Sequence, residues 1–166
     1  MEAVVGVLLY DEPDSDLNIL LIHRADRIND PWSGQIGLPG GRVADSDRST
    51  RDALRREVFE EVGINLNDEG KELGTLSIGS PMRQLEMKVQ PWVYGLTTLP
   101  KVKIGPEVQQ AFWVPVARLP SLRSTAEIEI RGTRRLVDSF SVNGHVVWGY
   151  THRVLNELLS LDEKPS

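Results

Sequence analysis

The segment LRREVFEEVGI, residues 54–64, carries three glutamates within a stretch of five residues. In a helix, residues three and four apart share a face, so Glu57 would lie beside both Glu60 and Glu61. Like charges at these spacings weaken an isolated helix by about 0.2–0.5 kcal/mol per pair. Two interpretations account for the cluster: a solvated helix face, or a metal site in which a bound cation offsets the repulsion.

The residues upstream of the glutamates favour a metal site. In GLPGGRVADSD, residues 37–47, Gly40 and Gly41 allow the backbone to bend sharply and to approach a ligand closely. Arg55 and Arg56 flank the glutamates. A hard divalent cation such as Mg²⁺ prefers oxygen ligands and is commonly held by a few carboxylates together with substrate phosphates. A glycine turn leading into a helix with clustered carboxylates therefore indicates a site for a metal ion and phosphates.

The hydrophobic pattern predicts the elements that carry these residues. Residues 3–10 and 17–23 read as two strands of a hairpin, and residues 24–47 as a long loop rich in Gly, Pro and Asp. A helix follows, because apolar residues then recur at helical spacing after a capping pair and before a glycine stop. The capping pair is Ser49 and Asp52, the stop is Gly63, and the apolar stripe is Ala53, Leu54, Val58 and Val62.

The remainder of the chain is rich in predicted strands and ends in a second helix. The helix is expected over residues 150–161, and the pair Asn143-Gly144 marks a hairpin turn. Strands mixed with two separated helices predict an α/β (α+β) domain with a mixed sheet between helices, spanning residues 1–166 as one unit. The strands are expected over residues 72–80, 86–96, 109–116, 126–132 and 134–149.

Composition narrows the function classes. The chain has 166 residues, a formal charge of −5 and no cysteine. The absence of cysteine excludes a disulfide framework, a thiol nucleophile and thiolate metal ligands. The acidic balance predicts no stable nucleic-acid partner, since such binding usually rests on a basic surface. The start MEAVVGVLLY lacks the basic region of a secretory signal, and no run of about 18 apolar residues occurs, so we expect a cytoplasmic protein without a membrane span.

The run GGRVADSDRSTRDALRREVFEEVGI, residues 40–64, resembles the Nudix box, G-x5-E-x7-R-E-U-x-E-E-x-G-U with U aliphatic. The first half departs from that pattern, because Gly41 lies one residue too far from Arg56 and Asp47 replaces the glutamate. The second half matches position for position, at Arg56, Glu57, Val58, Glu60, Glu61, Gly63 and Ile64.

This resemblance implies a Nudix-like α/β/α sandwich with a mixed β-sheet between helices. It also implies metal-dependent hydrolysis of a pyrophosphate bond in a small molecule linked to a nucleoside diphosphate. Arg56 would orient the glutamates by ion pairing. The ligands of Mg²⁺ or Mn²⁺ would be Glu57, Glu60, Glu61 and the carbonyl oxygen of Gly41.

The general base stays open between two sources. Several carboxylates close together can serve both as ligands and as proton acceptor. Glu60 or Glu61 is the choice that the resemblance suggests. The rival is Glu107 in IGPEVQQAFWVPV, residues 104–116, which precedes a predicted strand, as an extra glutamate does in several Nudix enzymes.

Two regions outside the box resemble the coenzyme A pyrophosphatase branch of the family. They are LLIHRADRINDPWSGQIGLPGGRVADSD, residues 20–47, and HVVWGYTHRVLNELL, residues 145–159. Arginine offers a planar fork suited to phosphate oxygens, so arginines of this part of the chain are candidate substrate contacts. The predicted substrate-binding residues are Arg24, Arg27, Arg42 and Gly40.

Alternatives remain at the level of substrate and class. The substrate could instead be ADP-ribose, NADH, a dinucleoside polyphosphate or a nucleoside triphosphate, or the chain could be a non-catalytic module that senses a nucleotide. Intact glutamates at all three positions of the box speak against the second alternative. Isopentenyl diphosphate isomerases of this fold resemble one another in using a catalytic cysteine, which is absent here. The expected partner is a small nucleotide diphosphate, and a homodimer is compatible with the sequence.

Overall fold

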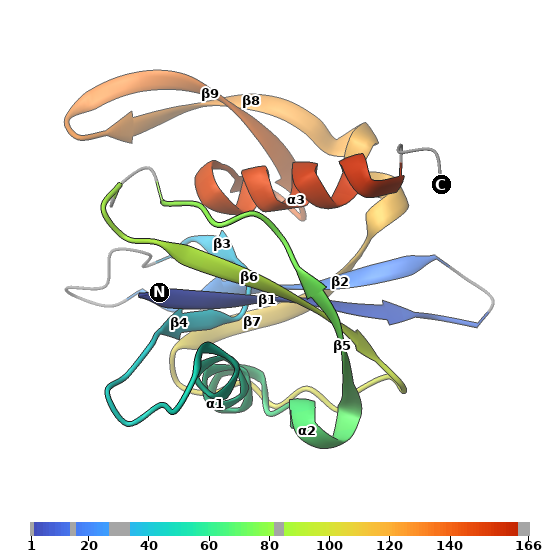
Figure 1. Ribbon diagram of the computed structural model, residues 1–166. Helices are drawn as coiled ribbons and strands as arrows, with labels where there is room; N and C mark the ends of the chain where they lie inside the picture. Colours follow the sequence, from blue (N-terminus) through green and yellow to red (C-terminus); the bar gives the residue numbers. More distant parts are fainter. Residues whose placement is uncertain (1, 14–15, 27–33, 82–84, 163–166) are drawn as a thin grey trace.

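The computed structural model describes residues 2–13, 16–26, 34–81 and 85–162 (Figure 1). The chain forms an α/β sandwich in which a mixed sheet lies between two long helices. None of the helices in the described ranges is both long and apolar enough to cross a membrane.

The central sheet has seven strands and is built around β1, Ala3–Asp11. The predicted hairpin is confirmed, because β1 pairs antiparallel with β2, Leu17–Arg24. On its other side β1 runs parallel to β6, Val89–Leu96, and this pair makes the sheet mixed. The remaining strands are β5 (Gly70–Thr75) beside β6, β7 (Val108–Pro115) and β3 (Ile36–Gly37) beside β2, and β4 (Gly40–Arg42) beside β1.

The two long helices cover opposite faces of this sheet (Figure 1). Helix α1, Thr50–Val62, buries its apolar stripe completely, and a short helix α2, Leu66–Glu69, follows it. Helix α3, Gly149–Asp162, packs on the other face and confirms the predicted second helix. Each face has its own hydrophobic core. The helix stripe packs with Val4, Leu8, Leu20, Ile22 and Tyr94, and helix α3 packs with Leu9, Leu21, Phe140, Val142 and Val147.

A second sheet lies on the side of α3 and was not predicted as a separate unit (Figure 1). It follows a 3-10 helix over Val116–Leu122 and joins three strands: β8 (Arg123–Ile130), β9 (Thr133–Val142) and β10 (His145–Val147). The predicted turn at Asn143-Gly144 is confirmed, with φ of 50° and 80°. Alternation of apolar residues marks each strand but does not say which strands pair, so the division into two sheets required the structure.

Two sequence predictions differ in detail. The predicted strand over residues 72–80 ends at Thr75, and Gly79 then forms an isolated bridge with Val89. The predicted loop over residues 24–47 contains the short strands β3 and β4. These strands are only two and three residues long and are rich in glycine, so they supply no apolar alternation by which the pattern could reveal them.

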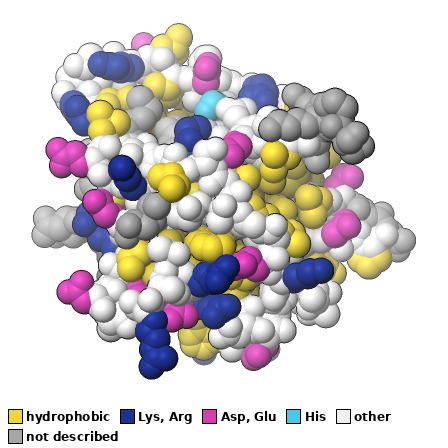
Figure 2. All heavy atoms as spheres, viewed as in Figure 1, with side chains coloured by type: hydrophobic (Ala, Val, Ile, Leu, Met, Phe, Trp, Pro, Cys, Tyr) yellow, Lys and Arg dark blue, Asp and Glu magenta, His cyan; other side chains and the backbone are white. Residues whose placement is uncertain are grey.

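On the face shown in Figure 2, acidic and basic side chains are interspersed.

Candidate metal and active site

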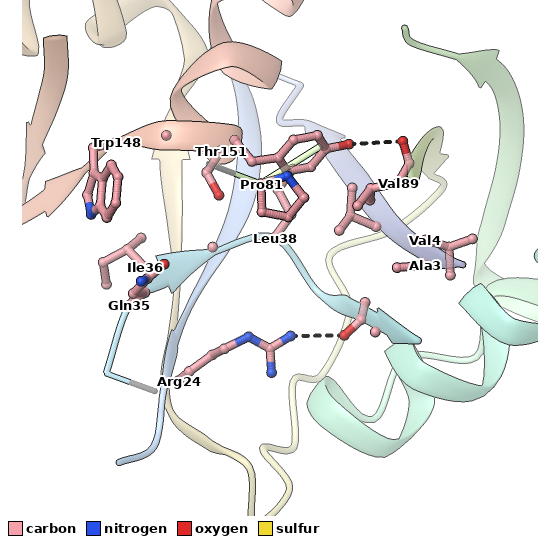
Figure 3. A pocket seen from close by; sticks show the side chains of 16 residues that line it. Ala3, Val4, Arg24, Gln35, Ile36, Leu38, Pro81, Val89, Trp148 and Thr151 are labelled. Carbon is pink, nitrogen blue, oxygen red and sulfur yellow. Dashed lines mark hydrogen bonds between the residues drawn. The ribbon is translucent and has the colours of Figure 1, made fainter. Parts of the chain in front are cut away.

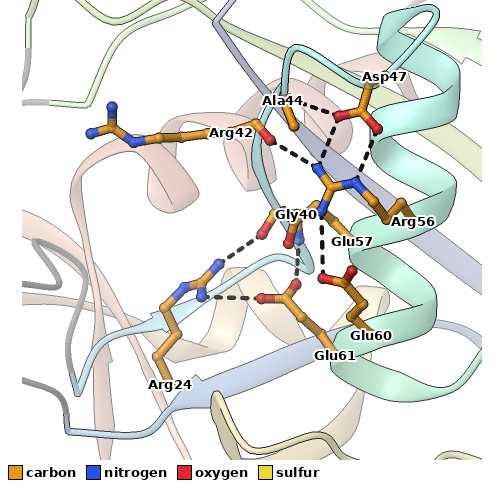
Figure 4. Close-up of polar contacts among 9 residues, drawn as sticks. All are labelled: Arg24, Gly40, Arg42, Ala44, Asp47, Arg56, Glu57, Glu60 and Glu61. Carbon is orange, nitrogen blue, oxygen red and sulfur yellow. Dashed lines mark hydrogen bonds and ion pairs between the residues drawn. The ribbon is translucent and has the colours of Figure 1, made fainter.

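Helix α1 presents the glutamates because its two ends are fixed. At the N-terminus the Asp52 N–H donates to Ser49 Oγ at 3.1 Å, which confirms the predicted cap. At the C-terminus Gly63 adopts φ of 71°, and its N–H donates to the Phe59 carbonyl at 3.0 Å. With the apolar stripe buried against the sheet, Glu57 and Glu61 lie on the flank that faces strand β4 (Figure 4).

Strand β4 approaches both β1 and α1 so closely that it requires glycine. Gly40 has φ of 154°, and a Cβ there would lie 2.1 Å from the Val4 carbonyl oxygen. A Cβ on Gly41 would lie 2.7 Å from the carboxylate carbon of Glu57. The two glycines therefore leave room for a carboxylate between the strand and the helix.

A third carboxylate reaches the same place from the segment before β7. The carbonyls at the end of α1 accept hydrogen bonds from this segment, Val62 O from Lys103 N at 2.9 Å and Glu61 O from Gly105 N at 3.0 Å. The Glu107 carbonyl then accepts from Ala25 N at 3.0 Å, which ties the segment to the end of β2. Glu107 is thereby held beside the last turn of the helix.

Carboxylate oxygens of Glu57, Glu61 and Glu107 lie within 4.8 Å of one another. Glu61 is almost completely buried, Glu57 is partly buried and Glu107 is exposed. The structure does not bring Glu60 into this described group. Its side chain is 56% exposed and lies 3.4 Å from Arg56 Nη1 (Figure 4). The sequence placed three helix carboxylates together, whereas the structure combines two of them with the loop carboxylate.

Glu61 is held by one arginine and one backbone amide. Arg24 Nη1 lies 3.1 Å from Glu61 Oε2, and Arg24 Nη2 donates to the Gly40 carbonyl at 2.9 Å. The Gly40 N–H donates to Glu61 Oε1 at 2.7 Å. Burial nevertheless raises the pKa of Glu61 to about 7, because these partners offset only part of the lost hydration. Burial also raises the pKa of Glu57, and Arg56 opposes this rise.

Arg56 joins the helix to the loop before it. Its Nε and Nη2 donate to the two oxygens of Asp47 at 3.0 and 2.9 Å, and its Nη1 donates to Glu57 Oε1 at 2.9 Å. The hydrogen bond from Arg56 holds the pKa of Asp47 below its usual range, and Asp47 in turn raises the pKa of Arg56. Asp47 stands where the resembled motif has a glutamate, and here it orients the arginine that orients Glu57.

The donor set fits a hard divalent cation. Three carboxylates from two segments converge, and Mg²⁺ and Mn²⁺ prefer such oxygen ligands. Oε2 of Glu61 is buried and makes no hydrogen bond within the described residues, although Arg24 is its ion-pair partner. A cation at this point would offset the unfavourable burial of two carboxylates, which their raised pKa values express.

A pocket of about 90 Å³ begins beside these residues. Arg24 lines one end of it, and Trp148, which precedes α3, and Thr151 of α3 line the other (Figure 3). Gly40, whose carbonyl accepts a hydrogen bond from Arg24, and Gly41 also line the pocket. Among the predicted substrate residues, Arg24 and Gly40 thus belong both to the pocket and to the surroundings of Glu61. The sequence resemblance included the segment around Trp148, but nothing in residue spacing could place it at this pocket.

Of the other two predicted arginines, the structure describes only Arg42. The Arg42 side chain points away from the carboxylates in Figure 4, while its carbonyl oxygen accepts from Arg56 Nη2 at 3.2 Å. Arg27 lies outside the described residues.

The α/β/α fold and an acidic cluster beside a glycine strand define a class of domain suited to metal ions and phosphates. A model of the NUDIX domain matches residues 2–136, and the chain belongs to this family. It is 31% identical to the uncharacterized Nudix hydrolase NudL of Cronobacter sakazakii over 170 residues, 99% of this chain and 84% of that protein.

Two further likenesses concern nucleotide ligands. The peroxisomal coenzyme A diphosphatase ndx-8 of Caenorhabditis elegans is 32% identical over 120 residues, 70% of this chain and 50% of that protein. The NUDIX domain of Shewanella oneidensis NrtR, solved in complex with ADP ribose, is 25% identical, with a TM-score of 0.53 over 72% of this chain and 75% of that one. This chain spans about half the length of several curated relatives.

Proposed function

We propose that this protein hydrolyses a pyrophosphate bond in a small molecule that contains a nucleoside diphosphate. The observation that carries the proposal is the group formed by Glu57, Glu61 and Glu107, which lies beside Gly40 and Gly41 where the pocket begins. Membership of the NUDIX family and the name of the Caenorhabditis relative support the same reaction class.

In the proposed site, Glu57, Glu61 and the Gly41 carbonyl would hold Mg²⁺ or Mn²⁺, and Glu60 lies outside this group. The ion would lower the pKa of bound water and offset the charge that develops on the phosphoryl oxygens. Arg56 keeps Glu57 in place, and Arg24 keeps Glu61 in place.

We assign the general base to Glu107 in preference to Glu60 or Glu61. Glu61 is fixed by Arg24 and Gly40, and Glu60 lies outside the group, whereas Glu107 is exposed and can pass a proton to solvent. The oxygen of water forms a bond to phosphorus, the bridging P–O bond breaks, and Glu107 accepts the proton of the water. The second phosphate leaves with the bridging oxygen.

Coenzyme A is the substrate we favour, because a relative that shares 32% identity is named as a coenzyme A diphosphatase. The test is a panel with Mg²⁺ or Mn²⁺ that contains coenzyme A and its thioesters, ADP-ribose, NADH, dinucleoside polyphosphates and nucleoside triphosphates. We expect coenzyme A to yield adenosine 3′,5′-bisphosphate and 4′-phosphopantetheine only with metal. If another compound of the panel were hydrolysed and coenzyme A were not, coenzyme A would be rejected as the substrate. If no compound were hydrolysed, the proposed reaction would be rejected.

A double variant, Glu60→Gln with Glu61→Gln, tests whether the carboxylates carry this reaction. We expect its turnover to fall by at least a hundredfold while the protein remains folded by circular dichroism. Glu127→Gln with Glu129→Gln on the exposed strand β8 removes the same two charges away from the site and serves as the control. Normal turnover by the folded double variant would contradict the assignment.

Other properties stay predictions. A single domain over residues 1–166, a homodimer and the lack of a nucleic-acid partner rest on sequence arguments. Since the Caenorhabditis relative is named as peroxisomal, kinship does not favour a cytoplasmic location over another compartment.

A further inference from the structure

The pocket is chemically different at its two ends. Arg24 lies at the end beside the acidic group, and Trp148 and Thr151 lie at the opposite end (Figure 3). Arg24 is the only charged side chain among the sixteen described residues that line the pocket. Its two Nη atoms already engage Glu61 and the Gly40 carbonyl, so the single cation belongs to the acidic end.

The far end offers apolar surface with a few neutral polar groups. Ile36, Leu38, Val89 and Pro81 supply apolar walls, and the neutral polar side chains are Gln35, Tyr150 and Thr151. An anionic group placed there would lose hydration without a cation among the described lining residues to pair with, which is strongly unfavourable. Neutral amides, by contrast, can exchange hydrogen bonds with such hydroxyl and carboxamide groups.

The aromatic wall of the pocket is fixed in place. Tyr150 Oη donates to the Val89 carbonyl at 3.5 Å, and the Arg153 guanidinium lies 5.3 Å from the Tyr150 ring centroid. Arg153 Nη2 in turn donates to the Ser77 carbonyl at 2.9 Å, and a Cβ on Gly79 would lie 2.2 Å from Nη2. These contacts hold the tyrosine ring against the sheet, so it is poorly placed to swing open for a bulky planar group.

The pocket is also narrow. Its volume of about 90 Å³ is small beside the roughly 300–1,000 Å³ typical of clefts that enclose a drug-sized ligand. Thr151 Oγ1 would lie 3.7 Å from a Cβ on Gly37, so helix α3 comes close to strand β3 within the pocket. An extended chain can pass between the helix and the strand at this point more easily than a fused ring system can.

We propose that the pocket binds the neutral, chain-like half of the substrate, attached through its phosphate to the acidic end, and leaves the nucleoside half outside. This inference rests on the proposed hydrolysis of a pyrophosphate. In coenzyme A the two halves differ sharply: the pantetheine chain is uncharged and carries two amides, whereas the adenosine half carries an additional 3′-phosphate. Since Arg24, the charged residue among the described lining residues, lies at the acidic end, the far end of the pocket suits the uncharged pantetheine chain.

The test narrows the pocket at Gly37 without touching the carboxylates. An added methyl at Gly37 meets only Thr151 Oγ1, at the ordinary contact distance of 3.7 Å, so Gly37→Ala and Gly37→Val should fold. Gly95→Ala on strand β6 adds the same methyl to a strand glycine away from the pocket, where it meets Leu73 Cδ1 at 3.3 Å, and is the control. Thermal melts of all three variants establish that they are folded.

Binding of 4′-phosphopantetheine and of adenosine 3′,5′-bisphosphate is then measured by calorimetry with Mg²⁺. We expect Gly37→Val to weaken phosphopantetheine binding at least tenfold and to change bisphosphate binding less than twofold, with an intermediate effect for Gly37→Ala. Selective weakening of the bisphosphate, or no change for either ligand, would overturn the proposal.

Because binding is measured without turnover, the outcome separates this proposal from the proposed reaction. Selective loss of phosphopantetheine binding would support the subsite even if the substrate panel showed no hydrolysis. Hydrolysis of coenzyme A with unchanged phosphopantetheine binding in a folded Gly37→Val protein would leave the reaction standing and refute the subsite.

Discussion

At the scale of single residues, the two carboxylates of the site that helix α1 buries are each held by a cationic or N–H partner. Glu61 is almost completely buried between Arg24 and the Gly40 amide, and Glu57 is held by Arg56. The raised pKa of both glutamates shows that these partners do not fully offset burial. A divalent cation would offset the remaining cost of burying these carboxylates. Protonation of the two glutamates, metal binding and the stability of the fold should therefore be linked.

The first prediction concerns the stability of metal-free protein as a function of pH. The pKa of Glu61 is raised from 4.5 to about 7 on folding, so its contribution is fully present below pH 4.5 and is lost as pH rises through 7. The difference corresponds to about 3 kcal/mol in the free energy of unfolding. Urea unfolding in EDTA at pH 4.5, 6 and 8 should show this loss, and Glu61→Gln should remove it. An equal pH dependence in both proteins would contradict the assignment.

The second prediction concerns the pairing of Arg56 with Asp47. The two side chains share two parallel hydrogen bonds, and an Arg56→Lys change cannot reproduce that fork. Asp47→Asn and Arg56→Lys should each lower kcat roughly tenfold to a hundredfold, as loss of a group that orients metal ligands does. The double variant should be little worse than either single variant. Additive losses in steady-state kinetics would show that the two residues act separately.

At the scale of elements, helix α1 and strand β4 must meet at a fixed distance for the site to form. The helix followed from its sequence because its stripe, its Ser49 cap and its Gly63 stop are all local signals. Strand β4 did not, because its glycines matter through contacts with Val4 and Glu57, which lie far away in sequence. Glu107 joins the group for the same kind of reason, since the hydrogen bonds of its segment to the end of α1 are long-range.

The third prediction separates the roles of the two glycines in β4. Gly40→Ala places a Cβ against the Val4 carbonyl at a strained φ, so it should lower the free energy of unfolding by roughly 1–3 kcal/mol. Gly41→Ala instead meets the Glu57 carboxylate, whose side chain can move. It should leave the melting temperature within a few degrees but reduce metal-dependent turnover at least tenfold. A stable Gly40→Ala protein, or a fully active Gly41→Ala protein, would contradict this division.

At the scale of the whole molecule, the central sheet separates two hydrophobic cores. It also brings the carboxylates of α1 and the pocket wall at the start of α3 close together. Helix α1 supplies carboxylates from one face, and the start of α3 supplies the pocket wall from the other. Sequence alone indicated the fold class and the helix of the site, because amphipathic stripes, caps and turns are encoded locally. It named Glu107 as a candidate but could not reveal its grouping with Glu57 and Glu61, the second sheet or the pocket at Trp148, which all depend on long-range contacts.

The central claim is that Glu57 and Glu61 hold a divalent cation beside Glu107, the proposed general base. Mn²⁺ titration followed by electron paramagnetic resonance tests it directly on the protein and on Glu61→Gln, Glu107→Gln and the control Glu127→Gln. We predict that Glu61→Gln binds Mn²⁺ at least tenfold more weakly than the parent, while Glu107→Gln and the control bind it nearly as well as the parent does. Unchanged Mn²⁺ affinity in a folded Glu61→Gln protein would contradict the account.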